Sequence, residues 1–364
     1  MGNRGDQDKG KARNSVHPML IRIGLLLSPV MLMACSTVTS TATEFETVHQ
    51  QFTQTYQDQD WDEAVELALR LDKLRPDSAR VQYNVACAWA QQGDPDTALS
   101  WLEKAAQNGF TDARATETDA DLNSLHALPG WPAVMGAING NRVRRQAKIS
   151  QVFSTLPLPL AMPYDWDGAT PAPLVITLHG YGGRADNFPQ LWRRAASKKG
   201  AIVAAPWGHS PIYNGSSWTD LFEAETIVEL TIEWVAERYP IDRQRIVLSG
   251  FSQGGRMSYA IAVRRPELFA GVIPMGAGYM SSFNKPPQAG EHRPRYYFMV
   301  GVDDQSAKHN RQAVADFEAA GYEVDLRVYP KSGHSFPTVD KNRELFRALS
   351  FVLPLGIKNT SAAK

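Results

Sequence analysis

A serine flanked by glycines is the first feature of the sequence that could do chemistry. The stretch IVLSGFSQGGRMS, residues 246–258, places Ser252 between Gly250 and Gly254. The apolar run before the serine predicts a strand, and RMSYAIAVRRP after it has helical periodicity. A strand, a sharp turn and a helix are typical of a nucleophile elbow, which lifts a serine hydroxyl above a sheet. The alternative interpretation is a plain glycine-rich turn.

A serine hydroxyl is a weak nucleophile and needs a neighbouring base. In a chain with this elbow the order is serine, then an acid, then histidine. Of the downstream histidines, His334 lies in YPKSGHSFP, a loop directly after the last expected strand, EVDLRVYP. His292 falls in a proline-rich loop and His309 near the start of a helix, so both are expected to be solvated. We therefore predict His334 as the base.

The acid should follow the preceding strand, YYFMVG, and two aspartates do so. Their spacing from Gly301 favours Asp304 as the carboxylate that orients the imidazole. Asp303 is then expected to cap the turn or helix that follows. The choice between the two aspartates stays open at this point.

A hydrolytic serine also requires backbone donors for the oxyanion of the tetrahedral intermediate. The stretch VITLHGYGG places a glycine-rich loop after a strand, and the residue after the nucleophile supplies the second donor in such elbows. We assign the two N–H groups to Tyr181 and Gln253. His179, in the same loop, is out of order for a base and is predicted to have a structural role.

Aromatic residues in PWGHSPIYNGSSWTD follow another expected strand. Trp207, Tyr213 and Trp218 would lie at the carboxyl edge of the sheet, where α/β proteins bind ligands. They are candidates for lining the substrate site. The alternative is that they pack the loop against the helix that begins near Asp220.

Short apolar runs that alternate with amphipathic segments must position all of these groups. The expected strands are PLVITLHG, AIVAAP, RIVLSG, AGVIPMG, RYYFMVG and EVDLRVYP. Continuous apolar strands separated by helices predict a mostly parallel sheet with helices on both faces. We assign residues 151–357 to this α/β domain and residues 358–364 to a C-terminal tail.

The preceding part of the chain has a different periodicity. DWDEAVELALRLDKLRPD and DPDTALSWLEKAAQNGF align at an offset of 34 residues, with Ala64 matching Ala98. A 34-residue period with small residues at helix contacts resembles tetratricopeptide repeats over about residues 45–110. We therefore predict an all-α tetratricopeptide-like module at 45–140, joined to the α/β domain by a basic linker at 141–150. The module is equally suited to binding a partner protein and to packing against its neighbour.

PLVITLHGYGG, YPIDRQRIVLSGFSQGG, VGVDD and SGHSFP together resemble the α/β-hydrolase superfamily, especially its carboxylesterase, phospholipase-like and polyhydroxyalkanoate-depolymerase-like members. The likeness spans about residues 150–355. It implies an α/β-hydrolase fold and a serine hydrolase that cleaves small-molecule or polymer esters through an acyl-enzyme, with no metal or organic cofactor. A serine peptidase or acyltransferase on the same residues is an alternative. An envelope scaffold with an inert hydrolase domain is another.

The N-terminal segment has the charged-then-apolar layout of an export signal. Its apolar stretch, LLLSPVMLMAC, ends at Cys35, and LMAC resembles a bacterial lipobox in which this cysteine becomes lipidated. We expect an export signal at 1–35, a polar tether at 36–44 and a membrane lipid anchor in the bacterial cell envelope. A translation start at Met19 would give a more typical signal.

The balance of charges bears on which classes of partner the protein binds. Thirty-eight basic residues balance 38 acidic ones among 364 residues, so no global field favours nucleic acid. The other cysteine, Cys87, lies on the apolar stripe of a helical repeat. We predict it to be a core residue.

Overall fold

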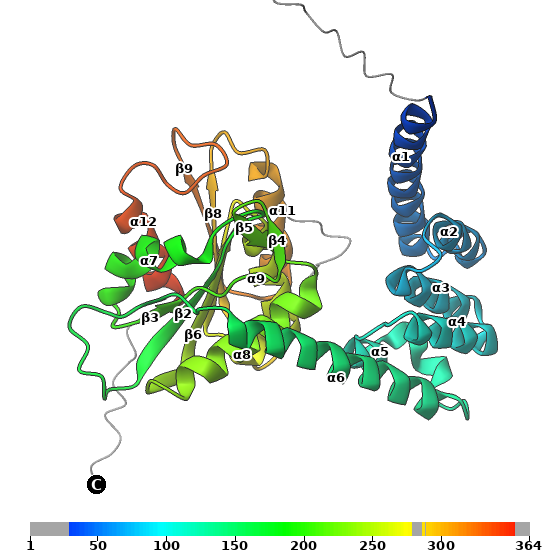
Figure 1. Cartoon of the computed structure of the whole chain (residues 1–364), viewed down its shortest axis with the longest axis horizontal. Coiled ribbons are helices and arrows are strands. Elements are labelled where there is room, and N and C mark those ends of the chain that lie inside the picture. The colour runs from blue at the N-terminus through cyan, green and yellow to red at the C-terminus, as the bar shows by residue number, and fades with distance from the viewer. Residues whose placement is uncertain (1–28, 279–285, 288, 354–364) are drawn as a thin grey trace, which may run out of the picture.

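The computed structural model describes residues 29–278, 286–287 and 289–353, without the side chains of residues 29–42. Figure 1 shows a helical module and a sheet domain connected by one long helix. The module consists of α1 (Pro29–Gln57), α2 (Trp61–Leu74), α3 (Ala79–Gln92), α4 (Pro95–Gln107), α5 (Ala113–Thr118) and the 3-10 helix η1 (Ala120–Leu125).

The helices of the module begin and end where the sequence offers capping residues. Asp60, Ser78 and Asp94 each accept a hydrogen bond from the backbone N–H three residues later, as N-cap residues do. Gly93 ends α3 in a left-handed conformation, with φ of 98°, that glycine adopts without strain. Helices α1 to α4 therefore form two helical hairpins packed side by side.

Buried small residues bring these helices together. Ala64 and Ala98, which are 34 residues apart, are both fully buried, as the repeat pattern predicts. Cys87 is also buried, in an apolar cluster with Leu102 and Leu122, so its predicted core position is confirmed. The helical nature of this region is established, and its kinship with tetratricopeptide repeats stays a prediction.

Two expected segments differ from the structure. The tether predicted at 36–44 is helical backbone within α1. The linker predicted at 141–150 lies inside α6 (Trp131–Thr155), a continuous helix of 25 residues. The polar sequence NGNRVRRQAK had suggested an irregular connection, but α6 packs its apolar residues at both ends and leaves this polar stretch between them.

The sheet domain has a seven-stranded sheet in the order β1-β3-β2-β6-β7-β8-β9. All neighbouring strands are parallel except β1, which pairs antiparallel with β3. The strands are β1 (Leu160–Ala161), β2 (Ala172–Leu178), β3 (Ile202–Ala204), β6 (Ile241–Phe251), β7 (Gly271–Met275), β8 (Arg295–Gly301) and β9 (Val324–Tyr329). A separate hairpin is formed by β4 (Ser210–Ile212) and β5 (Gly215–Ser217).

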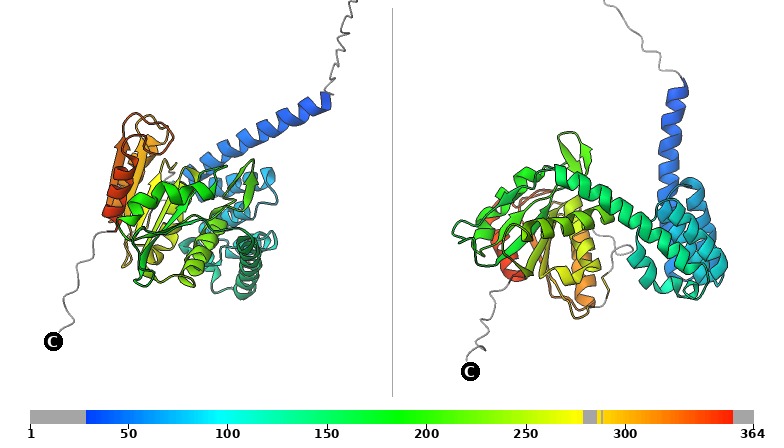
Figure 2. Two further views of the ribbon diagram at one scale, coloured as in Figure 1. Left: turned by 60° about the vertical axis from the view of Figure 1, so that its left-hand side comes forward. Right: turned by 60° about the horizontal axis from the view of Figure 1, so that its bottom comes forward.

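Helices cover both faces of the sheet, as Figures 1 and 2 show. Side chains of β2 alternate between the faces: Leu174 and Ile176 join the core beneath α8, α9 and α11, and Val175 joins the core beneath α7 and α12. The helices are α7 (Phe188–Ser197), α8 (Leu221–Ala236), α9 (Gln253–Arg264), α11 (Ala307–Ala319) and α12 (Lys341–Val352), with short 3-10 turns η2 (Ala185–Asn187) and η3 (Pro266–Leu268). The predicted mostly parallel sheet with helices on both faces is confirmed.

The parallel arrangement places the candidate loops at one edge. Leu178 at the end of β2 pairs with Gly250 near the end of β6, so the loops that follow these strands begin side by side. Gly301 at the end of β8 likewise pairs with Tyr329 at the end of β9. Four loops from four strands therefore meet above the carboxyl edge of the sheet.

Candidate active site

Ser252 occupies a strained turn between β6 and α9. Its φ of 55° and ψ of −115° are unfavourable for a residue with a side chain, and such strain persists only where the surroundings hold it. The Ser252 N–H donates a hydrogen bond to the Met275 carbonyl over 2.8 Å, which ties the turn to the neighbouring strand β7. The chain thus fixes the serine in an otherwise unfavourable conformation.

The flanking glycines make this turn sterically feasible. A Cβ atom at Gly250 would lie 2.2 Å from the Gly254 carbonyl oxygen, and one at Gly254 would lie 2.3 Å from the Leu178 carbonyl oxygen. Contacts this short with backbone atoms exclude any side chain. The glycines of the sequence pattern therefore serve close backbone packing.

Ser252, His334 and Asp304 form a continuous hydrogen-bonded chain. His334 Nε2 lies 2.8 Å from Ser252 Oγ, and His334 Nδ1 lies 2.8 Å from Asp304 Oδ2. The histidine side chain is about half exposed (49%), whereas that of the aspartate is almost fully buried (3%). The structure thus brings together the three side chains predicted as nucleophile, base and acid, with the geometry required for proton transfer from serine to histidine.

The environment of Asp304 favours its carboxylate form. Burial alone would raise the pKa of Asp304, but hydrogen bonds from the Ser306 N–H and from His334 outweigh it and hold the pKa below its usual value. Ser306 N donates to Asp304 Oδ1 over 2.8 Å, which leaves Oδ2 for the histidine. The carboxylate is therefore charged and oriented at neutral pH.

Asp303 is placed differently from Asp304. It is exposed and does not cap the following helix: α11 begins after Ser306 without a side-chain cap. In the turn before α11, the Ser306 N–H donates to the carboxylate of Asp304 and not to that of Asp303. The capping role predicted for Asp303 is therefore wrong, because the buried carboxylate both accepts from the turn and contacts the histidine.

The loop after β2 lies against the serine. Gly183 N donates to the Gly180 carbonyl over 2.9 Å, and Gly182 has φ of 65°, so residues 180–183 form a tight turn. A Cβ atom at Gly180 would come within 3.3 Å of the Ser252 Cβ. Tyr181, at the turn, and Gln253, the first residue of α9, both line the cavity in front of Ser252. The N–H of a first helical residue has no partner within its helix.

His179 has the structural role predicted for it. Its Nδ1 lies 2.8 Å from the Gly180 carbonyl oxygen and must donate to it, so the unprotonated Nε2 accepts from the Gly208 N–H and the Ser216 hydroxyl. Burial lowers the pKa of His179 although the bond to Gly180 opposes this effect. The neutral imidazole thus joins the loop after β2 to the loop that carries the β4–β5 hairpin.

A cavity of about 760 Å³ opens in front of Ser252 and His334. Its lining includes residues that were not predicted to lie there, among them Arg256, Gln305 and His309. Arg256 lies four positions after Ser252, one helical turn along α9, so helical spacing could have identified it. His309 lies on the first turn of α11, just after the loop that carries the acid, and was expected only to be solvated.

The three aromatic candidates do not line this cavity. Trp218 is buried, stacks on the His179 ring and donates from Nε1 to the His179 carbonyl. Trp207 packs in a small cluster with Phe188, and the Tyr213 side chain is 99% exposed. Trp218 belongs to the core cluster that contains Ala224 of α8, as the alternative interpretation states, whereas Trp207 packs beside α7 instead.

One group of potential metal donors is found in the described part of the chain, away from this cavity. Cys87, Asp119 and Asp121 lie in the helical module with their donor atoms within 4.8 Å of one another. Tyr83 OH donates to Asp119 and Tyr56 OH donates to Asp121. Each phenol already binds one oxygen of a carboxylate, so the group is explained as a polar contact of α1 and α3 with the start of η1.

The predicted lipidation residue Cys35 lies on the backbone of α1, and its side chain is outside the described residues. The predicted signal up to residue 28 and the tail from residue 358 also lie outside them. Within the residues that were described, we find no helix with the length and apolar character needed to cross a membrane.

Residues 208–352 match the model of the dienelactone hydrolase family. A probable feruloyl esterase C from Aspergillus niger is 28% identical over 152 residues, which cover 40% of this chain and 53% of that protein. A putative carboxymethylenebutenolidase from Yersinia pestis is 26% identical over 210 residues, which cover 50% of this chain and 74% of that protein. The chain spans about half the length of the feruloyl esterases that it matches.

Among solved structures, a phospholipase/carboxylesterase from Dyadobacter fermentans is 17% identical, with a TM-score of 0.42 over 53% of this chain and 95% of that one.

The family match contains Ser252, Asp304 and His334, and the sheet, helices and elbow have the arrangement expected from the sequence. The second half of the chain therefore has the α/β-hydrolase fold.

Proposed function

We propose that this protein is a serine hydrolase that cleaves carboxylic esters through an acyl-enzyme. The observation that carries the proposal is the hydrogen-bonded chain from Ser252 Oγ through His334 to Asp304, with 2.8 Å at each link. The relatives named as esterases and as a carboxymethylenebutenolidase support the same class of reaction.

In the first half of the proposed reaction, Ser252 Oγ attacks the ester carbonyl carbon as its proton passes to His334 Nε2. Asp304 stabilises the imidazolium that forms and keeps the ring in the required tautomer. The tetrahedral intermediate then collapses, and the bond to the alcohol breaks as His334 returns the proton to the leaving oxygen. The products are the free alcohol and an acyl group on Ser252.

In the second half, a water molecule gives a proton to His334 and attacks the acyl carbon. Collapse of this intermediate releases the carboxylic acid and returns the proton to Ser252. Apart from the ester and the water molecule, every group in these steps belongs to the chain, and His334 returns in each half the proton that it accepted.

The proposed oxyanion donors are the backbone N–H groups of Tyr181 and Gln253. Gln253 is the first residue of α9, so the partial positive charge of the helix N-terminus adds to its N–H. The Gln253 side chain is occupied elsewhere, since Oε1 accepts from the Trp218 N–H and Nε2 donates to the Trp218 carbonyl. These two bonds hold the first turn of α9 against Trp218, and neither of them uses the backbone N–H of Gln253.

The proposed activity is tested by turnover of purified protein on a panel of p-nitrophenyl esters, methyl hydroxycinnamates and aminoacyl amides. Ester cleavage that falls by about 10⁴ to 10⁶-fold in kcat in Ser252→Ala supports the proposal. The control Ser100→Ala removes an exposed hydroxyl in α4 and should not alter the rate. Faster cleavage of amides than of esters would favour a peptidase instead.

We also propose that the chain is exported and anchored by a lipid at Cys35 in the cell envelope, on the strength of the LMAC motif. The helical module is proposed to be tetratricopeptide-like from its 34-residue period and its two packed helical hairpins. Such a module would suit a protein partner, although its contacts with the sheet domain indicate a second role.

A further inference from the structure

A second cavity, of about 620 Å³, lies between the helical module and the sheet domain. One wall is formed by the start of α3 and the loop after α4, and the other by α8 and α9. Arg256 lines this cavity and also the cavity in front of Ser252. The groove between the two modules is therefore adjacent to the proposed active site along the first turns of α9.

The groove is held in shape by a helix common to both modules. Near its start, α6 buries Val134 and Ile138 in the helical module, and near its end it buries Ile149 in the core beneath the sheet. Figure 2 shows α6 running without a break from one module to the other. A continuous helix anchored in two cores limits how far the modules can move apart.

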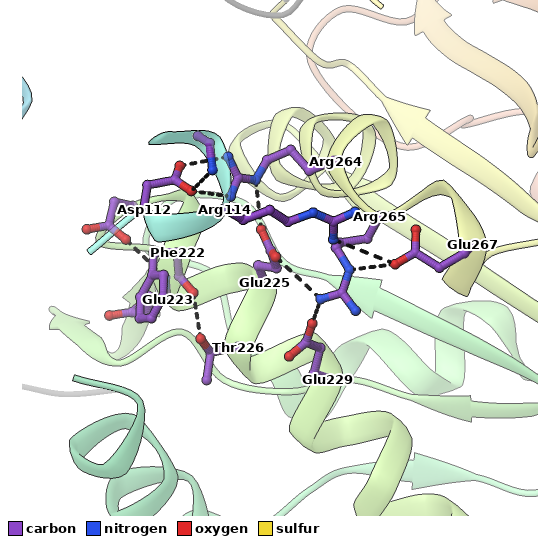
Figure 3. Close-up of polar contacts among 12 residues, drawn as sticks. Asp112, Arg114, Phe222, Glu223, Glu225, Thr226, Glu229, Arg264, Arg265 and Glu267 are labelled. Carbon is purple, nitrogen blue, oxygen red and sulfur yellow. Dashed lines mark hydrogen bonds and ion pairs between the residues drawn. The ribbon is translucent and has the colours of Figure 1, made fainter. Parts of the chain in front are cut away.

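Ion pairs among residues that line the groove add a second connection. Arg264, near the end of α9, donates to both oxygens of Asp112 over 2.8 and 2.9 Å and to Glu225 of α8 over 2.9 Å (Figure 3). Arg145 of α6 pairs with Asp220, the N-cap residue of α8. Two-point contact between a guanidinium and a carboxylate fixes orientation as well as distance.

The groove combines an apolar surface with two arginines that have no ionic partner among the described residues. Its apolar side chains include Phe110, Phe222 and Met257. In contrast to Arg145 and Arg264, neither Arg80 nor Arg256 forms an ion pair or a side-chain hydrogen bond with any described residue, and both are exposed. An elongated apolar ligand with an anionic end matches this distribution.

We propose that this groove is an extension of the substrate site, and that the protein prefers esters whose acyl part is long, apolar and ends in an anionic group. The ester carbonyl lies at Ser252, the chain passes Arg256 into the groove, and the distant anion lies near Arg80 of the helical module. This inference rests on the proposed ester hydrolysis. It gives the module a direct part in substrate selection.

The test compares three p-nitrophenyl esters: the neutral dodecanoate, the hemi-ester of dodecanedioic acid, and the ester of 12-(trimethylammonio)dodecanoic acid. In the full-length wild type, kcat/KM should be highest for the anionic ester. Arg80→Gln should lower the ratio of anionic to neutral kcat/KM by about tenfold, the loss of one charge-assisted contact. Arg80→Glu should reverse the preference in favour of the cationic ester, a gain that misfolding cannot produce.

Arg70→Gln is the matched control, since Arg70 is an exposed arginine of the same module that pairs with Glu44 and does not line the groove. It should leave the ratio unchanged. If p-nitrophenyl acetate is cleaved but Arg80→Glu has the wild-type order of preference, the groove proposal is wrong and the ester hydrolase proposal stands. If the wild type cleaves none of these esters, both proposals fail.

Discussion

His334 Nε2 lies 2.8 Å from Ser252 Oγ although 82 positions separate the two residues in the chain. The sheet order explains this proximity, because β6, β7, β8 and β9 are consecutive neighbours and their carboxyl ends meet at one edge. The serine follows the first of these strands and the histidine follows the last. The buried Asp304, which follows β8, contacts the other ring nitrogen of His334 and orients the imidazole.

The role of Asp304 predicts a large effect from a minimal change. Asp304→Asn should lower kcat for ester hydrolysis by about 10⁴-fold, because an amide no longer selects the imidazole tautomer that accepts the serine proton. Steady-state kinetics on p-nitrophenyl acetate measures this loss, and circular dichroism checks that the variant is folded.

Asp303→Asn is the matched control for Asp304→Asn. Asp303 is the exposed neighbour that lines the cavity without contacting His334, so its loss should lower kcat by no more than about tenfold. Equal losses in the two variants would contradict the assignment of the acid.

His179 predicts a specific dependence of stability on pH. Because its pKa is lowered by burial, the folded protein keeps this imidazole neutral at a pH where the unfolded chain, with an ordinary pKa near 6.5, binds a proton. The contribution of neutral His179 to the free energy of unfolding is therefore complete above about pH 6.5. It is lost as pH falls, by up to about 1.4 kcal/mol per pH unit.

Urea unfolding at pH 7 and pH 5 tests this dependence in the wild type and in His179→Gln. Like the neutral imidazole, the glutamine amide both donates and accepts hydrogen bonds, but it does not titrate, so the variant should lose less stability on acidification. Identical losses in the two proteins would show that His179 does not titrate as the geometry requires.

A glycine of the elbow and a glycine of α6 predict opposite results for two Gly→Ala substitutions. Gly254→Ala places a Cβ atom 2.3 Å from the Leu178 carbonyl oxygen and should destabilise the protein by about 1–3 kcal/mol. Gly136→Ala, inside α6, meets no atom within 4 Å and should stabilise it by about 0.5–1 kcal/mol. Thermal unfolding of both variants measures the direction of each change in stability. An unchanged stability in Gly254→Ala would refute the close packing of β2 against the elbow.

Much of the sheet domain could be predicted because local signals agreed with the global fold. Buried parallel strands are read as continuous apolar runs, and turns rich in glycine mark their ends. Chain order then selected Ser252, Asp304 and His334 from local motifs alone. The structure brings these side chains together because each lies in a loop after a strand, at one edge of the sheet.

The sequence was less informative where packing decides the outcome. Trp218 was a candidate for the substrate site, but stacking on the buried His179 draws it into the core. The polar segment 141–150 was expected to be a linker, yet it continues as helix because α6 is anchored at both ends. The groove beside Arg256 could not be predicted, since it depends on how two modules lie together.

The lipobox-like motif predicts that attachment to a membrane depends on the thiol of Cys35. Expressed in a bacterial host, the wild-type chain should partition into the detergent phase of a Triton X-114 extract, and its mature N-terminus should be a lipid-modified Cys35 by mass spectrometry. Cys35→Ala should move the protein to the aqueous phase, because the thiol that carries the lipid is lost. Detergent partition of Cys35→Ala equal to that of the wild type would contradict the anchor.

The activated state of Ser252 is the central claim, and labelling with a fluorophosphonate followed by peptide mass spectrometry tests it most directly. We expect the probe on the peptide that contains Ser252 in the wild type and no label in Ser252→Ala. A folded wild-type protein that stays unlabelled, or label that persists on another serine in the variant, would contradict the proposed nucleophile.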